Sequence, residues 1–127
     1  MVRNIQKEAF LSYEANAWFE RNEQYLAKLT SEKDPVLNIL KDYQIVPEKC
    51  LEIGASTGFR LNGIQQLFPS CQVVGVEPSK KAVIKGKTTY PNIQLIQGTA
   101  DDLSVFPAQS FDLLIGGFFM LIKSILV

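Results

Sequence analysis

The chain has 127 residues, 46% of them hydrophobic, and its 13 basic residues balance 13 acidic ones. This length predicts one domain with a small core, and zero net charge argues against electrostatic capture of nucleic acid or of an anionic membrane. Two cysteines are too few for a disulfide framework, the N-terminus has no apolar segment of signal-peptide length, and the longest apolar run, Leu113–Ile122, is far shorter than the roughly 20 residues of a membrane helix. We therefore expect a cytoplasmic protein with a small-molecule partner.

The N-terminal third of the chain is predicted to be helical. Apolar residues recur at helical spacing from about Gln6 to Leu29, with one break expected near Asn22. Asp34 offers an N-cap side chain and Pro35 stands at the first helical position, so a second helix should run to about Tyr43. This second helix is expected to bury Val36, Leu37, Ile39 and Leu40.

From Cys50 onward, short apolar runs alternate with helical segments. The runs at 50–53, 72–76, 93–96 and 111–115 are strand candidates, and Ser79 is expected to cap a short helix. Strands that are apolar on both faces and are joined by helices predict a parallel sheet in an α/β fold. We expect residues 1–45 to form a helical lead-in and residues 46–127 to form the sheet domain.

The first candidate strand ends in a glycine-containing turn, Gly54-Ala-Ser-Thr-Gly58. Ligands of open parallel sheets bind beyond the carboxyl ends of the strands, and a helix that starts at such a turn directs N–H groups toward an anion. The turn could thus bind a carboxylate or a phosphate, or it could be a plain tight turn. Glu52, within the strand, is expected to be buried and to need a donor, either a cofactor ammonium or a backbone N–H of the turn.

The other strand ends carry further candidates. Glu77, 23 residues past Gly54, stands where a carboxylate can accept hydrogen bonds from two ribose hydroxyls. The alternative is a solvated acid that caps the Ser79 helix. The loop Gly98-Thr-Ala-Asp-Asp-Leu103 could flank a heterocyclic ring or begin a short helix. Gly116-Gly117 could leave room for a ligand, or it could be a flexible strand end.

In this order, the segments CLEIGASTG, VVGVEPS, GTADDL and SFDLLIGG resemble the class I S-adenosylmethionine-dependent methyltransferases over about residues 47–118. The resemblance implies a Rossmann-like parallel sheet of about four strands flanked by helices. It implies S-adenosylmethionine as cofactor and S-adenosylhomocysteine as product, with no metal. The implied cofactor-binding residues are Glu52, Gly54, Ala55, Ser56 and Gly58 for the methionine part, Glu77 and Pro78 for the ribose, Thr99, Ala100 and Asp101 for the adenine, and Gly116 for the amino-acid end.

Three positions qualify this resemblance. Ser56 replaces the middle glycine of the turn, which the outer glycines should compensate. Thr99 stands where an aspartate often reads the adenine amino group, so that contact would pass to Asp101 or to backbone. The segment Trp18–Asn22 resembles the lead-in helix of some small members, whose aromatic residues close over the cofactor, and ordinary packing of these aromatics is the alternative.

Competing nucleotide-binding folds match the sequence less well. An NAD-binding Rossmann domain would need glycines at positions 56 and 59, where this chain has Ser56 and Phe59, and a P-loop would need Gly-Lys-Ser/Thr after Gly54. The methyltransferase resemblance therefore remains the better match for the turn.

The sequence names no catalytic residue. Methyl transfer from a sulfonium needs mainly in-line placement of the acceptor, and the chain has no histidine for a His-assisted O-methylation. No Asn/Asp-Pro-Pro-Tyr/Phe sequence follows the fourth strand, which argues against members that methylate nucleobases or glutamine. Cys71 precedes the second strand and so is expected at the wrong end of the sheet for a nucleophile.

The resemblance implies further strands after the fourth, whereas the sequence ends at LIKSILV. We expect a truncated domain that keeps the cofactor half-site and whose fourth strand is an exposed edge, able with the C-terminus to pair two copies. Two functions follow. The first is a methyltransferase acting on a small-molecule acceptor, and the alternative is an inactive cofactor-binding or oligomerising module of the same fold.

Overall fold

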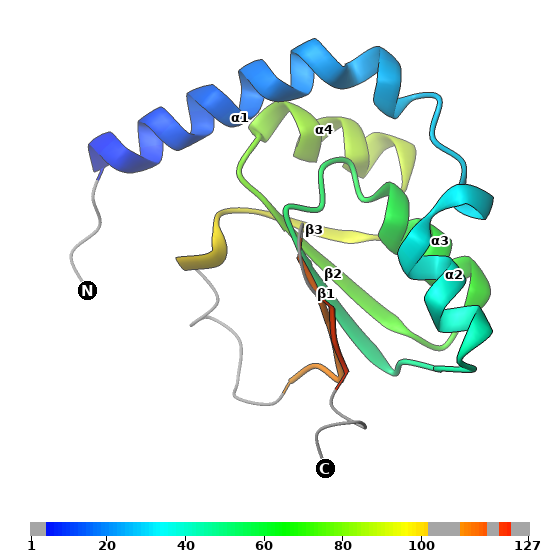
Figure 1. The fold of residues 1–127 in the computed structure, drawn as a ribbon. Helices are drawn as coiled ribbons and strands as arrows, with labels where there is room; N and C mark the ends of the chain where they lie inside the picture. Colours follow the sequence, from blue (N-terminus) through cyan, green and yellow to red (C-terminus); the bar gives the residue numbers. More distant parts are fainter. Residues whose placement is uncertain (1–4, 102–109, 117–119, 123–127) are drawn as a thin grey trace.

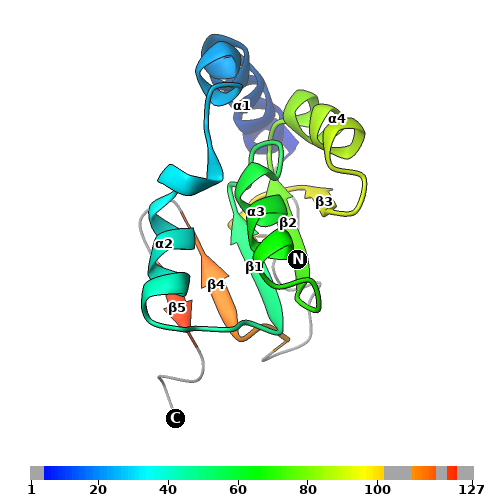
Figure 2. The same cartoon turned by 90° about the vertical axis from the view of Figure 1, so that its right-hand side faces the viewer.

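The computed structural model describes residues 5–101, 110–116 and 120–122 of the chain (Figure 1). The helices are α1 (Ile5–Leu26), α2 (Pro35–Asp42), α3 (Phe59–Leu67) and α4 (Lys80–Thr89), with a short 3-10 helix η1 (Ser31–Lys33). The strands are β1 (Lys49–Ile53), β2 (Gln72–Glu77), β3 (Gln94–Gln97), β4 (Leu113–Ile115) and β5 (Met120–Ile122). They form one sheet in the order β3-β2-β1-β4-β5 (Figure 2).

Strands β1 to β4 are parallel, which confirms the predicted α/β fold with a Rossmann-like sheet. The register pairs Ile53 with Val76, Glu77 with Gln97, and Glu52 with Ile115. The carboxyl ends of all the parallel strands therefore meet at one edge of the sheet, where the candidate residues were expected to gather.

The main hydrophobic core lies between the sheet and helices α2, α3 and α4. Buried side chains from the helices meet buried side chains from the strands there: Leu37, Leu40, Leu61, Ile64, Val83, Cys50, Val73, Leu95, Leu113 and Ile115. A smaller cluster of Leu51, Val74 and Val76 is buried on the opposite face. Strands buried on both faces explain why the sequence shows continuous apolar runs instead of alternation.

The prediction that the fourth strand is an exposed edge is wrong. Strand β5 pairs with β4 in antiparallel register, from Leu113 opposite Ile122 to Ile115 opposite Met120. The apolar run that follows Gly116 thus covers β4 with a strand from the same chain and supplies its hydrogen bonds. Three further predictions fall on residues outside the described ones. They are the helix start at 102–103, the ligand contact at 117, and the association surface at 123–127.

Two expectations for the N-terminal helices are also wrong in detail. Helix α1 is unbroken at Asn22, whose side chain donates to the carbonyl of Trp18 at 2.8 Å within the same helix. Ile39 is 37% exposed, because the helical period turns it away from the face that buries Leu37 and Leu40. The N-cap is confirmed: Asp34 Oδ1 accepts hydrogen bonds from the backbone N–H groups of residues 36 and 37.

Helix α1 lies over α4, and polar contacts join the two (Figure 1). Asn16 Oδ1 accepts hydrogen bonds from Ser79 Oγ at 2.7 Å and from the backbone N–H of Lys81 at 3.2 Å. Ser79 also caps α4 as predicted, since its Oγ accepts from the N–H of Ala82. Within the described ranges, no helix combines the length and apolarity that a membrane span requires.

Candidate functional site

The turn after β1 requires three residues in the left-handed region. Gly54, Ser56 and Gly58 have φ values of 75°, 54° and 88°. The N–H groups of Gly54 and Ala55 donate to the carbonyl of Val76, which fixes the turn to β2. A Cβ at Gly54 would meet no atom of the described residues within 4 Å, so this part of the turn is bare backbone with open space beside it.

Ser56 therefore does more than stand between two glycines. The outer glycines do make the turn, as predicted, but the middle residue shares their left-handed conformation, which is strained for a residue with a Cβ. Its hydroxyl oxygen is buried and has no hydrogen-bond partner among the described residues. The serine thus combines a backbone strain with an unpartnered polar atom, and each of these destabilises the ligand-free turn.

Replacing Ser56 by glycine is expected to raise the free energy of unfolding by about 1 kcal/mol, because the relief of strain exceeds the added freedom of the unfolded chain. Urea unfolding of wild type, Ser56→Gly and Ser56→Ala measures this. The alanine variant removes the hydroxyl but keeps the Cβ, so it separates the two effects. A glycine variant less stable than the alanine variant would contradict the strain.

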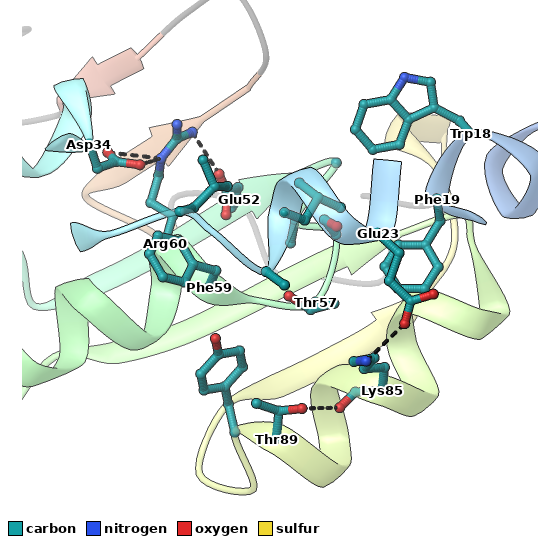
Figure 3. A pocket seen from close by; sticks show the side chains of 17 residues that line it. Trp18, Phe19, Glu23, Asp34, Glu52, Thr57, Phe59, Arg60, Lys85 and Thr89 are labelled. Carbon is teal, nitrogen blue, oxygen red and sulfur yellow. Dashed lines mark hydrogen bonds and ion pairs between the residues drawn. The ribbon is translucent and has the colours of Figure 1, made fainter. Parts of the chain in front are cut away.

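A cavity of about 430 Å³ lies beside this turn (Figure 3). Its walls come from α1, the turn, the start of α3 and the end of α4. Glu52, Arg60 and Asp34 line one part of it, and Trp18, Phe19 and Tyr90 are among the aromatic residues that line the rest. Phe19 is buried as ordinary packing predicts, whereas Trp18 is 49% exposed and borders the cavity.

Glu52 is buried and pairs with a side chain that the sequence analysis did not foresee. Arg60 Nη1 donates to Glu52 Oε2 at 2.9 Å, whereas the prediction was a cofactor ammonium or a backbone N–H of the turn. Arg60 Nε also donates to both carboxylate oxygens of Asp34, at 3.1 and 2.9 Å. Glu52 Oε1 is buried and has no partner among the described residues.

Burial raises the pKa of the Glu52 carboxyl to about 7, and the attraction of Arg60 only partly offsets this rise. The folded protein therefore holds this proton more tightly than the unfolded chain does, where the ordinary pKa is 4.5. Between pH 4.5 and about 7 the unfolded state binds fewer protons than the folded state, so the free energy of unfolding falls as pH rises.

We expect the free energy of unfolding of the wild type, relative to that of Glu52→Gln, to fall between pH 4.5 and about 7. Urea unfolding of both proteins across this interval checks the sign, because the glutamine does not titrate. A difference that is constant with pH, or that grows as pH rises, would contradict the raised pKa.

Glu77 is bound by backbone at both carboxylate oxygens. Oε1 accepts from the N–H of Ser56 at 2.8 Å and Oε2 from the N–H of Ser79 at 2.7 Å. Glu77 is 8% exposed, so the alternative of a solvated acid is wrong, and the residue that caps α4 is Ser79, whose N–H Glu77 binds. Burial raises the pKa of this carboxyl, and the two N–H donors oppose the rise.

The remaining predicted residues occupy the same edge of the sheet without lining the cavity. Among the described residues of the predicted cofactor set, Glu52, Gly54, Ala55 and Ser56 line it. Gly58 is the N-cap of α3. Beyond the other strands lie Pro78 after β2, Thr99, Ala100 and Asp101 after β3, and Gly116 after β4. The N–H of Asp101 donates to Thr99 Oγ1 at 3.3 Å.

Neither cysteine belongs to this edge. Cys71 immediately precedes β2, at the opposite end from the cavity, as predicted, and both Cys50 and Cys71 are buried. Burial raises the pKa of both thiols, to about 11 for Cys71. Because the thiolate is the nucleophile, neither side chain suits nucleophilic catalysis.

A family model described as a methyltransferase domain matches residues 50–124, which is more than half of the chain. The chain belongs to this family. The search of curated proteins gives no significant match.

Solved methyltransferases share the fold of this methyltransferase domain. PKMT2 from Rickettsia typhi, in complex with AdoHcy, is 28% identical over 54% of the chain and 14% of its own, with a TM-score of 0.50. The plantazolicin methyltransferase BpumL, with SAH and a desmethylPZN analog, is 17% identical over 86% of the chain and 48% of its own, with a TM-score of 0.53. The chain thus spans less than half the length of either protein.

Proposed function

We propose that this methyltransferase domain binds S-adenosylmethionine and transfers its methyl group to a small-molecule acceptor. The observation that carries the proposal is the Glu52 carboxylate, which lines the cavity beside the bare backbone of Gly54. One of its oxygens is buried and has no partner in the part of the chain that the structure describes. A buried acceptor of this kind fits an ammonium such as that of the methionine part of the cofactor. The bound SAH of the similar structures supports the same ligand.

We assign a set of residues to each part of this cofactor. Glu52 would accept from the ammonium, and the Gly54–Gly58 turn, which precedes α3, would present backbone to the carboxylate. Glu77 could accept from the ribose hydroxyls with its remaining lone pairs, although both of its oxygens already bind N–H groups. The other proposed contacts are Pro78 to the ribose, Gly116 to the amino-acid end, and the loop residues Thr99, Ala100 and Asp101 to the adenine.

The cofactor would supply a methyl group bonded to a sulfonium sulfur, and the remainder of the cofactor would leave as a neutral thioether. The protein then has to place the acceptor in line with that methyl group and to exclude water. An apolar wall of the cavity, formed by Trp18, Phe19 and Tyr90, can exclude water. The similar solved structures include BpumL with a desmethylPZN analog and coclaurine N-methyltransferase with N-methylheliamine, which supports an organic acceptor.

Calorimetric titration with S-adenosylhomocysteine, with NAD as the comparison ligand, tests the proposal. We expect saturable binding of S-adenosylhomocysteine and none of NAD, because the turn has Ser56 and Phe59 where the NAD pattern needs glycines. No heat of binding from S-adenosylhomocysteine would overturn the proposal, and binding of NAD would restore the dehydrogenase-type alternative. Binding without methyl transfer to any acceptor would favour the inactive cofactor-binding module.

A further inference from the structure

Arg60 joins two buried carboxylates that come from different parts of the chain. Its Nη1 binds Glu52 on β1, and its Nε binds Asp34, which is the N-cap of α2. Figure 3 shows the guanidinium between the two acids. The carboxylate side chains are only 9% and 6% exposed, so solvent screens these ion pairs weakly.

The charges around Glu52 do not balance. Asp34 and Glu52 share the single positive charge of Arg60, and Glu77 on β2 adds a further negative charge nearby. Burial of an excess negative charge is unfavourable unless a cation or a proton neutralises it. Among the described residues, the charged group here with an unfilled acceptor is Glu52, through its Oε1, and Glu52 lines the cavity.

We propose that Arg60 is a positioning residue for the cofactor. Asp34 anchors Arg60, and Arg60 binds Glu52 Oε2, so that Glu52 Oε1 remains available to the cofactor ammonium. This inference rests on the proposed function. A guanidinium suits the task because its planar fork can donate in two directions at once, whereas a lysine ammonium is a point charge on a flexible stem. The arrangement also links cofactor binding to α2, because Asp34 both caps that helix and fixes Arg60.

Arg60→Gln tests this inference with two ligands that differ only at the amino-acid end. S-adenosylhomocysteine carries the ammonium, and 5′-methylthioadenosine keeps the adenosine and the thioether without it. We expect Arg60→Gln to weaken S-adenosylhomocysteine binding about tenfold or more at pH 7 and to change methylthioadenosine binding less than about twofold. Arg21→Gln, at an exposed position on α1, is the matched control and should change neither affinity.

The pH profile separates positioning from a merely structural role. In the wild type, the affinity for S-adenosylhomocysteine should rise with pH through about 7 as Glu52 loses its proton. Without Arg60 the carboxyl faces Asp34 and Glu77 with no cation, so the midpoint of the rise should move to higher pH. Glu52→Gln should abolish the rise.

Three results would overturn the inference. Arg60→Gln could weaken the binding of both ligands equally, or it could leave the midpoint of the rise in affinity with pH unchanged. If Arg60→Gln fails to fold by circular dichroism, Arg60→Lys decides, because it keeps the charge and loses the fork. We expect it to weaken S-adenosylhomocysteine binding several-fold and to spare methylthioadenosine, and wild-type affinity for both ligands would refute the bridging role. A wild type that binds neither ligand would instead refute the proposed function itself.

Discussion

Gly86→Ala is expected to lower the free energy of unfolding by roughly 3 kcal/mol or more. Gly86 lies in α4 where the helix packs on the Gly54–Gly58 turn, and an added Cβ would stand 2.2 Å from the backbone oxygen of Thr57. A backbone oxygen cannot rotate away as the end of a side chain can. The helix and the turn would therefore have to separate, and urea unfolding measures the loss.

Gly63→Ala is the matched control in α3. Its added Cβ would stand 2.7 Å from Leu37 Cδ1, which is the far end of a flexible side chain. Because alanine also favours the helix, we expect a change within about 1 kcal/mol. Equal losses in the two variants would show that contact with the Thr57 backbone is not what requires Gly86.

Glu77→Ala is expected to lower the free energy of unfolding by roughly 2–4 kcal/mol, because two backbone N–H groups lose a charged acceptor. These N–H groups belong to Ser56 in the turn and Ser79 at the start of α4, so the carboxylate holds the two elements together. The same change should weaken S-adenosylhomocysteine binding, both through the loosened turn and through the proposed ribose contact.

Glu77→Gln is the control for that prediction. The glutamine keeps the shape and one oxygen acceptor, so about half of the stability loss is expected in urea unfolding. Wild-type stability of Glu77→Ala would show that the turn does not depend on this carboxylate. Wild-type affinity of a folded Glu77→Ala would refute the ribose contact.

Much of the fold was predictable because local signals and tertiary structure agree. Asp34 followed by Pro35 marks the start of α2, Ser79 marks the start of α4, and the buried strands read as short apolar runs. The glycine turn and the order of the strand ends then placed the candidate site at one edge of the sheet. The division into a lead-in and a sheet domain stays a prediction.

The errors come from interactions between distant residues. The antiparallel β5 continues the apolar run after Gly116, so the sequence does not show where the chain reverses. The left-handed conformation of Ser56 contradicts its local preference, as is common at functional sites. Arg60 was missed although one signal was present, since a buried acid at Glu52 calls for a cation and Arg60 lies just past the turn.

Backbone amide chemical shifts recorded during a titration with S-adenosylhomocysteine test the central claim most directly. The account predicts saturable shifts that are largest at Gly54, Ala55 and Ser56, together with a shift of the Trp18 indole N–H across the cavity. Saturable shifts that leave the glycine turn unperturbed, or no shifts at all, would contradict it.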